Sequence, residues 1–187
     1  LSGTKADPDM TAMAIQALAP YYKTNETVKA AVDKALEKLS AMQQVDGGFT
    51  SGGYLNSESS AQVIVALTAL GIDPAKDSRF IKIGATVLDA LASFYVDGGG
   101  FKHVSDGKLD GMATEQGYYA LAAYYRLVNG QGSLYDMSDV TITSSGNGNG
   151  NGGTPVTGDA GVMTWIIALP TAALAAALVL RRKERKA

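Results

Sequence analysis

The sequence contains no cysteine and one histidine, His103, among its 187 residues. The absence of cysteine excludes disulfide frameworks, thiolate metal sites and cysteine nucleophiles. A zinc site or a Ser-His-Asp triad would depend on that one histidine, and we expect no metal site and no cofactor. Residues 1–180 carry 11 basic and 17 acidic side chains. An acidic body of this kind disfavours nucleic acid as a partner.

The C-terminal part of the chain has the pattern of a membrane anchor. Residues 162–180 contain no charged side chain, and residues 181–187 carry five basic groups and one acidic group. About 20 apolar residues span a bilayer as a helix. Because cationic flanks stay on the cytoplasmic side, we expect a transmembrane helix over 162–180 with the preceding body outside the cell. A buried core helix is the alternative, but such a helix rarely ends a chain with a basic block.

A short motif precedes this apolar run. Thr154-Pro155-Val156-Thr157-Gly158 resembles the LPxTG pentapeptide of Gram-positive cell-wall sorting signals, with Thr154 where leucine is usual. In that family a sortase cuts between the threonine and the glycine and joins the threonine to peptidoglycan. The resemblance implies cleavage after Thr157, with sortase and peptidoglycan as partners and the cell surface as location. A plain membrane anchor is the alternative.

Three units follow from composition. We expect a folded body over residues 1–140, a linker over 141–153 and the sorting signal over 154–187. Residues 144–153 are serine, glycine and asparagine without an apolar side chain, so they cannot bury a core. A Gly-rich chain behaves as a flexible coil, which suits a tether between the body and the cell wall.

The body repeats with a period of about 50 residues. Segments 9–22, 58–71 and 112–125 share Ala-Leu pairs and are nearly uncharged, which predicts inner helices buried on all sides and starting near 9, 58 and 113. Segments 26–42 and 79–95 show apolar stripes at helical spacing, which predicts amphipathic outer helices. Asn25 and Ser78 are expected N-caps, and Asn129-Gly130 the end of the third inner helix.

A second repeated motif lies in the loops between these helices. Asp-Gly pairs permit left-handed backbone and a tight turn, and the phenylalanine that follows can fill the gap between helix layers. We therefore predict a structural role for the motif. Its residues are Asp46, Gly47, Gly48, Phe49, Asp97, Gly98, Gly99 and Phe101.

These motifs and the Ala-Leu pairs resemble the α/α-toroid repeats of terpenoid cyclases and protein prenyltransferases, over about residues 5–135. The resemblance implies an all-α fold, an incomplete α/α toroid with two layers of helices. A closed toroid needs more helices than the five predicted here, so we expect the chain to be the C-terminal part of a larger protein. The same toroid occurs in cobalamin-carrying proteins.

Asp7 and Asp9 are the candidate catalytic residues. Asp7-Pro8-Asp9-Met10-Thr11 looks like the DxDDTA motif of class II terpenoid cyclases, in which a carboxylic acid protonates an alkene, but Met10 replaces the last acid. A helix N-cap explains the same residues. The leading hypothesis is therefore a non-catalytic binding or adhesion module for a small molecule such as cobalamin, a glycan or a protein. The alternative is a cyclase-like enzyme that uses these aspartates.

Overall fold

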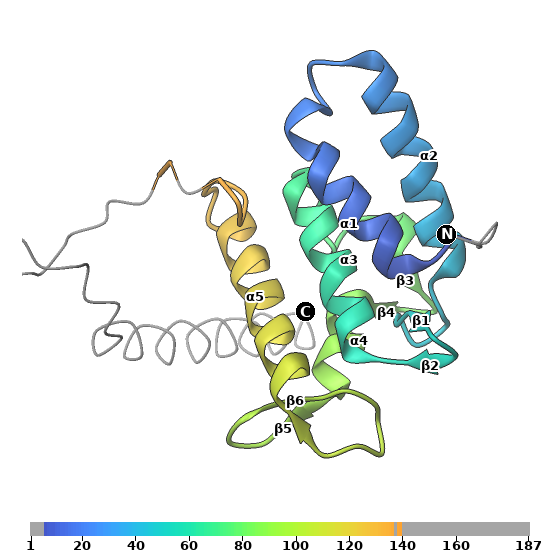
Figure 1. The fold of residues 1–187 in the computed structure, drawn as a ribbon, viewed down its shortest axis with the longest axis vertical. Helices are drawn as coiled ribbons and strands as arrows, with labels where there is room; N and C mark the ends of the chain where they lie inside the picture. The colour runs from blue at the N-terminus through green and yellow to red at the C-terminus, as the bar shows by residue number, and fades with distance from the viewer. Residues whose placement is uncertain (1–5, 137, 140–187) are drawn as a thin grey trace, which may run out of the picture.

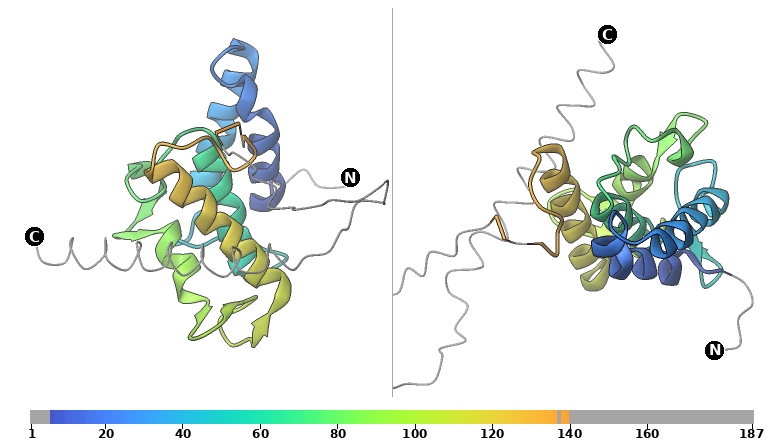
Figure 2. Two further views of the ribbon diagram at one scale, coloured as in Figure 1. Left: turned by 90° about the vertical axis from the view of Figure 1, so that its left-hand side faces the viewer. Right: turned by 90° about the horizontal axis from the view of Figure 1, so that it is seen from above.

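Three helices lie side by side at the centre of the fold. In the computed structural model, which describes residues 6–136 and 138–139, α3 (Ser57–Ala69) packs between α1 (Pro8–Leu18) and α5 (Gly111–Val128) (Figure 1). The two orthogonal views of Figure 2 show the same neighbours. α2 (Glu26–Met42) packs against α1, and α4 (Val87–Ser93) packs against α3. The predicted inner and outer segments thus form neighbouring helices in a mostly helical fold.

Short antiparallel strands join the helices, which the all-α prediction did not include. β1 pairs with β2, β3 pairs with β4, and β6 lies between β5 and β7. Two 3-10 helices, η1 and η2, complete the described elements. Their bounds are η1 Ala19–Tyr21, β1 Thr50–Ser51, β2 Tyr54–Leu55, η2 Ser78–Phe80, β3 Ile81–Lys82, β4 Ala85–Thr86, β5 Tyr95–Val96, β6 Gly100–Lys102 and β7 Leu109–Asp110.

The predicted outer helix over 79–95 is wrong in its first half. A β-hairpin turns at Ile83 and Gly84, both with positive φ, and α4 begins only at Val87. Thr86 caps α4 through a capping box with Asp89. The prediction failed because Phe80 is buried although it lies in η2, before the hairpin. Its burial matches that of Val87 and Leu91 in α4 and of Phe94 just after it, so the four residues together have helical spacing.

The helix ends follow the predicted signals with one exception. Asn25 is the N-cap of α2 and accepts hydrogen bonds from the backbone N–H groups of Thr27 and Val28. α5 ends at Val128, followed by Asn129 and a left-handed Gly130. Both predictions are confirmed. Ser78 caps no α-helix, because it is the first residue of η2 and Asp77 is the cap there.

The prediction of burial on all sides is confirmed for α3 alone. Val63, Ile64 and Val65 occupy three successive directions around α3, and each is fully buried. On α1, Met10 and Met13 are 62% and 50% exposed. The difference arises because α3 has an inner helix on both sides, whereas α1 and α5 each have one within the described residues.

The repeated loop motif lies before α3 and before α5. Phe49 and Phe101 are both buried, Phe101 against the rings of Tyr95 and Tyr118. The Asp46 carboxylate accepts a hydrogen bond from the backbone N–H of Gly48. Gly47 has a positive φ of 84°, and its carbonyl accepts a hydrogen bond from the buried side chain of Gln43.

Three predictions concern segments outside the described residues. These are the linker 141–153, the sorting signal 154–187 and its transmembrane helix 162–180. Among residues 6–136 and 138–139, no helix is both long enough and apolar enough to cross a bilayer.

Candidate functional site

The two candidate catalytic aspartates lie at the start of α1. Asp7 is the N-cap: its Oδ1 accepts hydrogen bonds from the backbone N–H groups of Asp9 and Met10, at 3.0 and 3.1 Å. Its Oδ2 accepts a hydrogen bond from the hydroxyl of Ser51, on β1. The N-cap prediction is confirmed for Asp7, whose two oxygens are thus engaged within the fold. Asp9 lies in the first turn, and its Oδ1 is buried without a hydrogen-bond partner.

A connected row of amide side chains crosses the three inner helices. Gln16 on α1 donates to Oε1 of Gln62 on α3, at 2.9 Å, and to the Gln62 backbone carbonyl, at 3.1 Å. Gln62 in turn donates to Oε1 of Gln116 on α5, at 3.1 Å. We call Gln16, Gln62 and Gln116 the glutamine ladder. It links helices whose residues are 46 and 54 positions apart in the chain.

Two tyrosines join the ladder, Tyr119 at its centre and Tyr135 at the Gln16 end. Gln62 Nε2 also donates to the hydroxyl of Tyr119, at 2.6 Å, and the hydroxyl of Tyr135 donates to Oε1 of Gln16, at 3.5 Å. Tyr135 belongs to the segment after α5, which folds back toward α1. The alignment of the inner helices places Gln62 and Gln116 at the same height, but it gives no sign that the two side chains bond each other. Gln16 falls outside that register and was missed.

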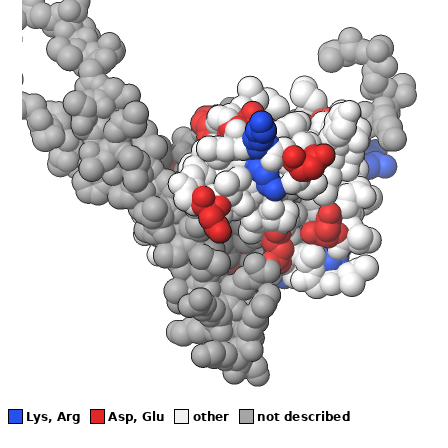
Figure 3. Space-filling view, turned by 90° about the horizontal axis from the view of Figure 1, so that it is seen from below, with Lys and Arg blue, Asp and Glu red and all other residues white. Residues whose placement is uncertain are grey.

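Acidic side chains lie near Tyr119. Burial is the main cause that raises the pKa of its hydroxyl above the ordinary value, and Tyr135, Glu115 and Asp9 raise it further. The inner helices carry one basic side chain, Arg126 near the end of α5. Figure 3 shows acidic side chains, with basic ones among them, on the face seen from below the view of Figure 1. A ligand at the ladder would therefore meet a negative field, which disfavours anions.

Arg126 fixes the segment that follows α5. Its side chain is 8% exposed and donates to the backbone carbonyls of Gly132 and Asp136 and to the carboxylate of Asp139. The Asp139 carboxylate also accepts from the backbone N–H of Gly132. We call Arg126 with these partners the arginine clamp. It holds the loop that carries Tyr135.

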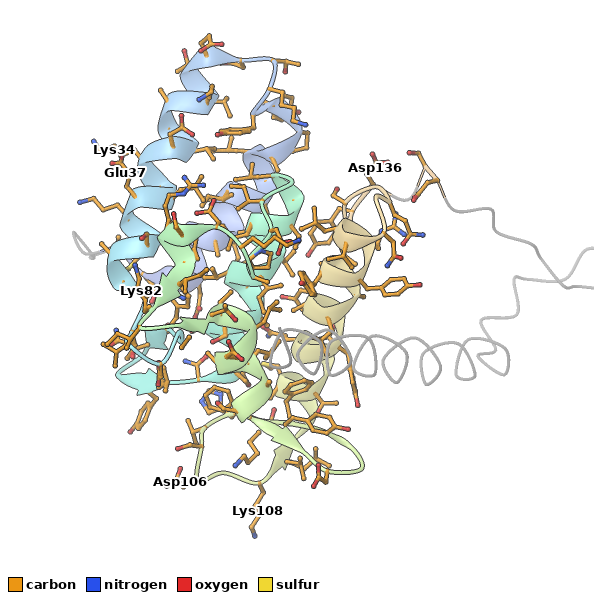
Figure 4. The ribbon with its side chains drawn as sticks, turned by 180° about the vertical axis from the view of Figure 1, so that it is seen from behind. Lys34, Glu37, Lys82, Asp106, Lys108 and Asp136 are labelled. Atoms are coloured by element: carbon orange, nitrogen blue, oxygen red, sulfur yellow. The ribbon has the colours of Figure 1, made fainter. Side chains whose placement is uncertain are left out.

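The histidine is paired with a glutamate that is 45 positions away in the chain. His103 Nδ1 lies 2.8 Å from Oε2 of Glu58, in the first turn of α3. Ser57 donates its hydroxyl to the same carboxylate, not to the histidine, so the three side chains do not form a nucleophile–base pair. Asp106 and Lys108 lie on the nearby loop between β6 and β7, at the opposite end of the molecule from Asp136 (Figure 4).

The described residues contain no cluster of His, Asp and Glu side chains that could hold a metal ion. A cavity of about 180 Å³ lies near the C-terminal ends of the inner helices, between Tyr22, Thr68 and Leu127. The sortase-motif residues Thr154–Gly158 lie outside the described ranges.

No protein-family model, curated protein or solved structure matches this chain.

Proposed function

We propose that this chain belongs to a sortase-anchored bacterial surface protein, in which its helical body is a non-catalytic binding module. The observation that carries the binding role is the glutamine ladder. Three inner helices present a continuous row of amide and phenol groups at a partly exposed surface. The anchoring role rests on the order of the sorting-like motif, the apolar run and the basic residues 181–187.

The body is proposed to be a segment of an α/α toroid. The side-by-side packing of α1, α3 and α5, with α2 and α4 packed on α1 and α3, supports this arrangement. So do the two phenylalanines that fill equivalent places before α3 and α5. The concave side of such a segment would carry the ligand.

Anchoring is tested by expressing the chain behind a secretion signal in a Gram-positive host that has a sortase. We expect protein released from the digested cell wall to end at Thr157, as read by mass spectrometry of its C-terminal peptide. A Thr157→Ala variant should remain in the membrane fraction with residues 162–180 attached. Wall material that ends at Ala187 would contradict the proposal.

The second candidate is a cyclase-like enzyme that uses Asp7 and Asp9. The buried, unpartnered Oδ1 of Asp9 is the one observation in its favour, whereas the hydrogen bonds of Asp7 fit a helix cap. The chain is incubated with squalene or a prenyl diphosphate, and products are identified by mass spectrometry. We expect no cyclised product from the wild type. A product that disappears in Asp9→Asn would establish the enzyme instead.

A further inference from the structure

The glutamine ladder leaves polar atoms unused. Within the part of the chain that the structure describes, Gln116 Nε2 donates to no partner, and the hydroxyl of Tyr119 accepts from Gln62 but donates to none. Asp9 Oδ1 is buried and accepts no hydrogen bond. Two donors on α5 and one acceptor on α1 are therefore free. The central residue is saturated, because both hydrogens of Gln62 Nε2 and its Oε1 are engaged.

Exposed apolar side chains accompany these groups. Met13 precedes Gln16 by three residues and Met112 precedes Gln116 by four, so each methionine lies on the same side of its helix as the ladder glutamine. Met13 is 50% exposed, Met112 66% and Tyr135 67%. We call these three side chains, the glutamine ladder, Asp9 and Tyr119 the ladder face. It combines directed polar groups with apolar surface.

The charged side chains near the ladder face indicate which class of ligand can bind there. Asp9 and Glu115 are close enough to Tyr119 to raise the pKa of its hydroxyl, and the one basic side chain on the inner helices, Arg126, is held by Asp139. No cation on these helices is available to pair with a phosphate, sulfate or carboxylate group. The two carboxylates and the lack of a free cation on these helices favour a neutral ligand over an anionic one.

We propose that the ladder face binds a neutral glycan. A sugar hydroxyl both donates and accepts, so its oxygen can accept hydrogen bonds from Gln116 and Tyr119. The C–H faces of the sugar rings would pack on Met13, Met112 and Tyr135. This inference rests on the proposed binding role and gives that role a ligand class. A peptide is less suited, because the exposed apolar side chains stand on three separate elements and not on one continuous stripe.

The test uses the whole chain, purified in mild detergent, on an array that carries neutral, sulfated and uronic-acid glycans together with unstructured peptides. We expect binding to neutral glycans, followed by titration calorimetry with the best neutral oligosaccharide. An array on which no glycan is bound, on which anionic glycans are preferred, or on which only peptides bind would overturn the proposal. Wall anchoring is measured separately, so that failure here leaves the anchoring result unaffected.

Two variants separate a binding role from a purely structural one. Gln116→Glu keeps an acceptor for Gln62 but removes the free donor, and Tyr119→Phe removes a free donor together with the oxygen that accepts from Gln62. Each should weaken glycan binding about tenfold or more. The thermal midpoint should stay near that of the wild type in Gln116→Glu and fall in Tyr119→Phe, because Gln62 loses an acceptor there. Tyr54→Phe, which removes an exposed phenol outside the ladder face, and Gln44→Ala are the matched controls and should bind normally. If Gln116→Glu and Tyr119→Phe bind as the wild type does, the ladder only holds the helices together.

Discussion

The ring of Phe101 fills the space beside the α-carbon of Gly117. A Cβ at position 117 would lie 2.4 Å from Cδ2 of this ring, far closer than nonbonded carbon atoms approach. The ring cannot move aside freely, because it is 1% exposed and packs edge-on against Tyr95 and Tyr118, with ring centres 5.4 and 5.7 Å away. Strand β6 therefore comes close to α5 because residue 117 has no side chain.

Gly117→Ala tests this contact. Alanine favours a helix interior over glycine by about 1 kcal/mol, but an added methyl group in a filled core costs about 1–3 kcal/mol. Because the contact of 2.4 Å places the cost at the upper end of that range, we expect a net loss of about 2 kcal/mol in the free energy of unfolding, measured by urea denaturation. Gly111→Ala is the control, because a Cβ there meets nothing within 4 Å. A Gly117→Ala variant as stable as the wild type would contradict the packing described.

Gly47→Ala should be more damaging than Gly84→Ala. Both residues have positive φ, 84° and 81°, so both substitutions carry left-handed strain of about 1–2 kcal/mol. At Gly84 the added Cβ meets open space, whereas at Gly47 it would lie 2.2 Å from the backbone oxygen of Thr86. We expect Gly47→Ala to cost about 3 kcal/mol or more. Parallel thermal and urea unfolding of the two variants measures the difference, and equal losses would show that the loop relaxes.

The arginine clamp should make stability depend on pH in the acid range. Hydrogen bonds from Arg126, and then from the backbone N–H of Gly132, lower the pKa of the Asp139 carboxyl below its ordinary value of 3.8. Because the folded-state pKa is the lower one, the stabilisation is complete above the unfolded-state pKa. It is lost as the pH falls through the folded-state value.

The wild type is compared with Asp139→Asn by urea unfolding between pH 2 and pH 7. We expect the wild type to be the more stable at pH 6 and the gap to close below about pH 4. Limited proteolysis at neutral pH should cut residues 130–139 faster in the variant. A stability gap that is the same at pH 2 and pH 6 would argue against the pairing.

Local signals in the sequence predicted much of the helical framework. Asn25 caps α2 and Asn129-Gly130 ends α5, since a cap depends on one residue and its immediate neighbours. Hydrophobic periodicity was less informative over 79–95. Gly84 and the Thr86–Asp89 capping box marked a turn and a new helix start there, but the buried spacing of Phe80 and Val87 concealed them.

The candidate site depends on contacts that no local pattern encodes. Gln16 and Gln62 are 46 residues apart, and His103 and Glu58 are 45 residues apart. Their pairing follows from how α1, α3 and the β6–β7 loop are placed against one another, not from either residue's neighbours. The exposure of Met10 likewise depends on which side of α1 has a neighbour, a property of tertiary arrangement.

The arginine clamp also determines how the body responds to mechanical tension on the chain. Tension applied to the chain beyond Asp139 reaches the folded part where the Arg126 guanidinium grips two backbone carbonyls and a carboxylate. Because these hydrogen bonds share one buried side chain, they bear the tension together and do not break one after another. Arg126 lies on α5, the helix that carries Gln116 and Tyr119, so the hydrogen bonds of the clamp must break before tension from that side reaches the ladder face.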